Sequence, residues 1–128
     1  MIQEFVRIWD EHKSEVEDSF RSEHPSYGSI VEAVVKMIHD HWDGYENPDP
    51  SRIHRIDDGD YHGTLLYVIA SDNYQPSTYW AVYVGYGSCS GCDTLQAISG
   101  YADGPPSEEQ IKDYMGLALN VLQGLKEI

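Results

Sequence analysis

In residues 2–20 the apolar side chains of Ile2, Phe5, Trp9, Val16 and Phe20 recur at helical spacing, and mostly acidic side chains occupy the other face. This spacing places the apolar positions on one face of a helix, so the segment predicts an amphipathic helix. Residues 29–42 repeat the pattern with a more continuous apolar stripe, and they begin with Ser29 and Glu32, the spacing of a capping box. We expect this second helix to form the centre of the core and to end at the Asp43–Gly44 pair.

In the middle of the chain the hydrophobic period changes to two. Residues 53–57 and 60–70 flank the Asp58–Gly59 pair, which favours a two-residue hairpin turn. Residues 64–70 are apolar at successive positions, as is typical of a central strand buried on both faces. Residues 78–86 are rich in aromatic and β-branched side chains and predict a third strand. The sequence therefore predicts a three-stranded antiparallel meander.

The last part of the chain returns to helical spacing. Residues 107–110, Ser-Glu-Glu-Gln, match a capping box, and the helix is expected to continue to the end of the chain with an apolar stripe packed on the sheet. Residues 93–98 predict a further short helix. The predicted fold is α+β, with two N-terminal helices, a three-stranded antiparallel meander and a C-terminal helix packed on the sheet, in a single domain over residues 1–128.

The charge of the chain limits its partners. The sequence has 8 Lys and Arg against 22 Asp and Glu, a formal net charge of -14. Because this charge repels phosphate backbones, we expect no direct nucleic-acid binding, whereas a basic protein surface is a suitable partner. No apolar run reaches the ~20 residues of a membrane span, and the first residues do not resemble a secretion signal. The sequence thus predicts a cytoplasmic protein without a membrane partner.

The third predicted strand supplies a candidate binding surface made of Tyr79, Trp80, Tyr83 and Tyr86. Strand side chains alternate, so Tyr79 and Tyr83 share one face, and Trp80 and Tyr86 share the other. One face must meet the helices, and the other remains for recognition of a protein partner or for a homodimer, since tyrosine and tryptophan contribute much of the energy of interfaces.

The two cysteines, Cys89 and Cys92, form a Cys-x-x-Cys pair in a glycine-rich segment. In a reducing compartment the pair is open to three interpretations, namely a zinc site, a dithiol redox centre or a small-residue turn with structural cysteines. Zinc requires at least one further ligand. An Asp58–Gly59 turn would pair Arg55 with His62, and the second hairpin would bring His62 near Gly87, so His62 is the best additional metal ligand. No residue is predicted to be catalytic or to bind another cofactor.

Residues 79–96, which include the run Tyr-Gly-Ser-Cys-Ser-Gly-Cys-Asp-Thr-Leu, resemble a segment of small uncharacterised proteins of tailed bacteriophages. The resemblance implies an accessory role in the bacterial cytoplasm during infection and favours binding of a host protein over catalysis. The leading hypothesis is therefore a non-enzymatic protein that binds another protein. The alternative is a zinc-binding or redox protein centred on Cys89 and Cys92, and hydrolysis by paired carboxylates is the third.

Overall fold

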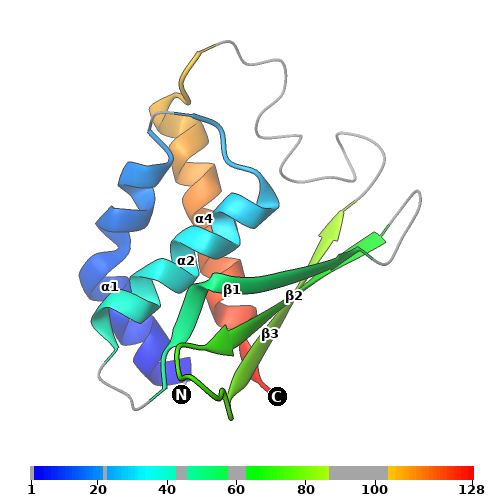
Figure 1. Ribbon diagram of the computed structural model, residues 1–128. Helices are drawn as coiled ribbons and strands as arrows, with labels where there is room; N and C mark the ends of the chain where they lie inside the picture. The colour runs from blue at the N-terminus through cyan, green and yellow to red at the C-terminus, as the bar shows by residue number, and fades with distance from the viewer. Residues whose placement is uncertain (1, 22, 43–45, 58–62, 87–103) are drawn as a thin grey trace.

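The computed structural model describes residues 2–21, 23–42, 46–57, 63–86 and 104–128. In these residues, three helices lie on one side of an antiparallel sheet (Figure 1). The strand order of the sheet is β1-β2-β3-β4. The predicted α+β class is confirmed, and the described part of the chain contains a fourth strand that the sequence did not predict. The elements are α1 (Ile2–Ser19), α2 (Tyr27–His41), β1 (Pro48–Asp57), β2 (Gly63–Ser71), β3 (Tyr79–Tyr86), α4 (Glu108–Gly124) and β4 (Lys126–Glu127).

The second helix begins one turn earlier than predicted. Its N-cap is Ser26, whose side chain accepts a hydrogen bond from the Ser29 amide at 3.1 Å. The Ser29 hydroxyl in turn lies 3.4 Å from the Ser26 amide, so the expected pairing of Ser29 with Glu32 was wrong. The helix ends at His41 with Trp42 as its C-cap, before the predicted stop at the Asp43–Gly44 pair. A serine therefore fills the place that a glutamate usually takes in the capping box.

The sheet has β2 at its centre, as predicted. The first hairpin, however, is not joined by a two-residue turn, because Arg55 lies opposite Tyr67 instead of His62. A tight turn would have paired β1 with the polar residues 60–63, whereas the observed register pairs Ile53 with Ile69 on the helix-covered side. Burial of apolar residues thus determines the register more strongly than the local turn preference.

The C-terminal helix starts as predicted, with the Ser107 side chain accepting a hydrogen bond from the Gln110 amide at 3.2 Å. It ends at Gly124 and does not continue to the end of the chain. Residues 126–127 form β4, with Lys126 opposite Ala81. A Cβ atom at Gly124 would lie 3.2 Å from Val82 Cγ2, so the absence of a side chain allows α4 to end close against β3.

Aromatic side chains join the helices to the sheet. Trp42 makes edge contacts with Phe5 of α1 and with Trp80 of β3, with ring centroids 5.4 Å and 5.9 Å apart. Trp80 is fully buried. His24 Nδ1 lies 2.5 Å from the Tyr114 hydroxyl, which ties the segment between α1 and α2 to α4. The helix-covered face of the sheet is therefore the core, and none of the helices in the described residues covers the opposite face.

Candidate functional site

The face of the sheet that the helices do not cover is the first candidate site, and we call it the open face. Cross-strand partners share one face of a sheet, so the pairing register identifies its members. The positions of this face whose side chains the structure describes are His54 and Ile56 on β1, Leu66, Val68 and Ala70 on β2, Tyr79, Ala81 and Tyr83 on β3, and Lys126 on β4.

The open face presents large apolar side chains to solvent. Tyr83 is 72% exposed, Ile56 51% and Tyr79 39%. Leu66 and Val68 between them are half-buried. Clusters of exposed apolar side chains of this kind mark interaction sites more often than the scattered single ones found on every protein.

The charge of the open face differs from that of the whole chain. None of its nine described positions is Asp or Glu, although the chain has 22 acidic residues. His54 and Lys126 are the two positions that can carry positive charge. The described positions of this face are therefore mainly apolar, as is typical of the centre of an interface.

The predicted binding surface is partly corrected by this arrangement. Tyr79 and Tyr83 lie on the open face, as the alternation along β3 allowed. Trp80 does not, because its side chain is fully buried between the sheet and the helices. The prediction that Trp80 contributes to a binding surface was therefore wrong. The side chain of Tyr86 lies outside the described residues.

A second candidate is formed by His12, Glu15 and His41, which we call the histidine cluster. His12 and Glu15 lie one turn apart on α1, and His41 is the last residue of α2. His41 Nε2 lies 2.6 Å from Glu15 Oε2, and His12 Nδ1 lies 3.5 Å from the same oxygen. The two imidazole rings stack with centroids 3.4 Å apart and planes within 2° of parallel. Two nitrogens and one carboxylate oxygen thus converge at the surface.

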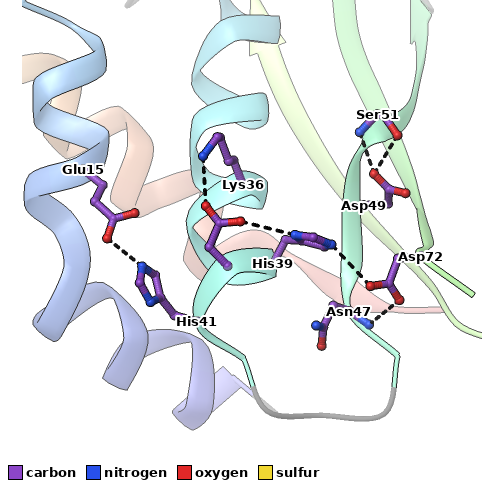
Figure 2. Close-up of polar contacts among 9 residues, drawn as sticks. Glu15, Lys36, His39, His41, Asn47, Asp49, Ser51 and Asp72 are labelled. Atoms are coloured by element: carbon purple, nitrogen blue, oxygen red, sulfur yellow. Dashed lines mark hydrogen bonds and ion pairs between the residues drawn. The ribbon is translucent and has the colours of Figure 1, made fainter.

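The sequence analysis did not single out the histidine cluster. The spacing of His12 and Glu15 does place them on one helical face, but the third member comes from another helix and only the packing of α1 on α2 supplies it. Figure 2 shows His41 extending from the end of α2 toward Glu15 on α1, while His39 extends toward the sheet.

His39 belongs to a polar network that holds α2 against the sheet. Its Nε2 lies 3.3 Å from Asp72 Oδ2 at the end of β2, and its Nδ1 lies 3.4 Å from Asp40 (Figure 2). Asp40 also accepts a hydrogen bond of 2.9 Å from Lys36, and this bond is the main cause that lowers its pKa below the usual value. The network consists of satisfied ion pairs, so we assign it a structural role.

A buried carboxylate, Glu46, anchors the loop between β2 and β3. It accepts hydrogen bonds from the side-chain amide (Nδ2) of Asn73 at 3.0 Å and from the Ser77 hydroxyl at 2.9 Å. Hydrogen bonds from the side chains of Thr78, Asn73 and Ser77, in which Thr78 has the largest effect, lower the pKa of Glu46 to about 2 from an ordinary 4.5. The ionised form of Glu46 is therefore the one that the fold prefers.

We expect Glu46 to make stability depend on acidity. A carboxylate whose pKa is lower in the folded state stabilises the fold above its unfolded-state pKa, and this contribution is lost as the pH falls. The free energy of unfolding should thus decline between pH 4.5 and about 2. Denaturant titrations over this range measure it. In Glu46→Gln the protein should be less stable at neutral pH and its stability should decline less on acidification, and an unchanged pH profile in this variant would contradict the assignment.

One carboxylate pair borders a groove between α1 and α4. The groove has a volume of about 450 Å³, and its lining includes Trp9, Glu17, Glu108 and Ile111. Arg21 donates hydrogen bonds to both carboxylates, one of them 2.8 Å long to Glu108. Because an arginine joins the two groups, this pair acts as an ion-pair bridge between α1 and α4, and it does not support the hydrolysis hypothesis.

The predicted metal ligands Cys89, Cys92 and His62 lie outside the described residues. The last described pair of the second hairpin, Gly63 opposite Tyr86, has the register on which the approach of His62 to Gly87 was based. The zinc, redox and structural interpretations of the cysteines all remain predictions.

A double replacement, Cys89→Ser with Cys92→Ser, is expected to leave the protein folded if the cysteines are only small residues in a turn, because serine is of similar size. Thermal unfolding and the metal content of protein purified without chelator measure the effect. A decrease of about one zinc per chain together with loss of the folded state would show a structural zinc site instead.

The fold and the two candidate sites define a small acidic α+β protein in which no described helix covers one face of the sheet. No family model, no curated protein and no solved structure matches the chain. None of the three described helices combines the length and the hydrophobicity that a transmembrane span needs.

Proposed function

We propose that this protein is a non-enzymatic binding protein that recognises another protein through the open face of its sheet. The observation that supports this proposal best is the exposure of Tyr83, Ile56 and Tyr79 together on a face without a described carboxylate. Tyrosine brings a large, rigid contact surface at a low cost in conformational entropy, which is why it is enriched in interfaces.

The charge distribution indicates the kind of partner. The chain carries a formal net charge of -14, whereas the described positions of the open face carry none of the negative charge. A partner with an apolar patch bordered by Lys and Arg would contact the tyrosines with the centre of that patch, and its basic border would complement the net negative charge of the chain. Two copies of this chain would instead bring together two molecules that each carry a net charge of -14, so we favour a different protein over a homodimer. A host protein encountered in the bacterial cytoplasm is the partner that the bacteriophage resemblance implies.

Selection from a ribosome-displayed peptide library against the immobilised full chain tests this proposal. We expect the selected peptides to combine aromatic or aliphatic residues with Lys and Arg, and to lose binding to Tyr83→Glu. The matched control is Tyr74→Glu, which makes the same change at a tyrosine that is 91% exposed in the loop between β2 and β3.

Three results would overturn the proposal. Peptides that bind Tyr83→Glu as well as the unchanged chain would place recognition on another surface. Equal losses of peptide affinity in Tyr74→Glu and Tyr83→Glu would show that the added negative charge alone weakens binding. Sedimentation that shows a dimer of the unchanged chain, dissociated by Tyr83→Glu but not by Tyr74→Glu, would identify a second copy as the occupant of the open face.

A further inference from the structure

We infer that the histidine cluster binds a divalent transition-metal ion, with His12, Glu15 and His41 as its protein ligands. This site is separate from the predicted Cys89, Cys92 and His62 set and from the open face. It would join α1 to α2, since two ligands come from the middle of α1 and the third from the end of α2.

The distances within the cluster suit one ion. One ligand atom from each of the three side chains lies within 4.8 Å of the other two. Around a tetrahedral zinc ion with bonds of about 2.0–2.1 Å, ligand atoms are roughly 3.4 Å apart. Small side-chain rotations would bring the three ligand atoms from their present separations to this distance. The rings must also turn out of their parallel stack, because the lone pair of an imidazole nitrogen lies in the plane of its ring.

The approach of two imidazoles to one carboxylate oxygen distinguishes the cluster from an ordinary surface ion pair. A hydrogen bond between His41 and Glu15 needs no third residue, and surface pairs of this kind contribute little to stability. The cluster adds His12, whose ring lies directly against that of His41 while its Nδ1 lies 3.5 Å from the oxygen that His41 contacts. Two imidazoles and a carboxylate around one point are the donor set of many zinc sites.

The surroundings favour a cation. Glu11 Oε2 lies 3.7 Å from His12 Nε2 and adds a carboxylate beside the cluster. Two basic residues of these helices are paired with carboxylates, Arg7 with Glu11 and Lys36 with Asp40. The side chains of His12, Glu15 and His41 are 31%, 46% and 26% exposed, so an ion can enter from solvent and keep a water molecule as a further ligand.

The donor set also limits which metal binds. Imidazole nitrogens suit Zn²⁺, Ni²⁺ and Cu²⁺. Among the divalent ions of the first transition row, Cu²⁺ binds such sites most tightly. Ca²⁺ and Mg²⁺ prefer sites made entirely of oxygen ligands. We therefore expect binding of Zn²⁺ and tighter binding of Cu²⁺, without competition from Ca²⁺.

Calorimetric titration with Zn²⁺ and with Cu²⁺ tests this site. It is performed on a chain in which Cys89 and Cys92 are replaced by Ser and His62 by Gln, so that the predicted cysteine site cannot respond. We expect one ion per chain and a melting temperature that rises on addition of Zn²⁺ and falls back on addition of chelator. In this background, His12→Gln and His41→Gln should each weaken binding at least tenfold, because loss of a supporting residue alone typically weakens metal affinity 10–100-fold.

The matched control is His54→Gln, which removes an exposed histidine of β1 and should leave the affinity unchanged. If the background replacements unfold the chain, the titrations use the unchanged chain instead. Only a loss of metal affinity that is specific to the His12 and His41 variants then supports the site. Each variant is also melted in chelator, which separates a loss of metal ligation from a loss of folding.

Three results would overturn the inference. The first is the absence of bound metal at millimolar Zn²⁺. The second is a metal affinity of His12→Gln equal to that of the parent chain, and the third is a loss of affinity in His54→Gln as large as that in His12→Gln. None of these results depends on a protein partner, so this test and that of the open face fail independently.

Discussion

Replacement of Trp80 with alanine is expected to lower the free energy of unfolding by about 3–5 kcal/mol. Trp80 is fully buried, and its ring contacts Trp42 at a centroid distance of 5.9 Å. The substitution removes a large apolar side chain at the point where β3 meets the helices, and the surrounding rings cannot close the cavity fully. Since domains of this size are stable by only about 5–15 kcal/mol, the variant should be close to unfolding. Denaturant unfolding measures the change.

The control for Trp80→Ala is Tyr74→Ala, which truncates another aromatic side chain that is 91% exposed. We expect this change to stay within about 0.5 kcal/mol, as surface substitutions usually do. If Trp80→Ala cost no more than Tyr74→Ala, the assignment of Trp80 to the core would be contradicted, and the predicted role of Trp80 in binding would deserve a new test.

Replacement of Tyr83 with glutamate is expected to weaken binding of the protein partner by about 2 kcal/mol or more, which corresponds to roughly 30-fold in the dissociation constant. Tyr83 is 72% exposed and lies across from Leu66 on the open face. A carboxylate there would lose the apolar contact and place negative charge on a surface whose described positions lack it. Titration with the selected peptides measures the affinity.

The folded state should tolerate this change, because Tyr83 contributes an exposed side chain and no core packing. We expect the melting temperature of Tyr83→Glu to remain close to that of Tyr74→Glu, so that a loss of binding reports on the interface. A Tyr83→Glu protein that binds peptides as tightly as Tyr74→Glu would refute the proposed use of the open face.

The helices could be predicted from the sequence because their spacing and caps are local. The stripe of apolar residues in α2 is buried as expected, and the Ser107–Gln110 capping box forms as its sequence indicates. The central position of β2 likewise follows from its continuous apolar run. In each case the information lies within one segment, where a period of 3.6 or 2 determines which side chains face inward.

The tertiary structure decided the features that join distant segments. Alternation along β3 separated Tyr79 and Tyr83 from Trp80, but only the helices packed on one side made the tyrosines exposed and the tryptophan buried. The pairing of Arg55 with Tyr67 followed from burial and not from the Asp58–Gly59 turn signal, and β4 is too short to leave a pattern.

The histidine cluster depends on the same kind of information, because the packing of α1 on α2 brings His41 to His12 across 29 residues of chain. Local periodicity thus determined the elements of this protein. The side of the sheet that stays open and the side chains that converge between helices were set by which apolar faces meet in the core, since burial of those faces contributes more free energy than any local turn or cap.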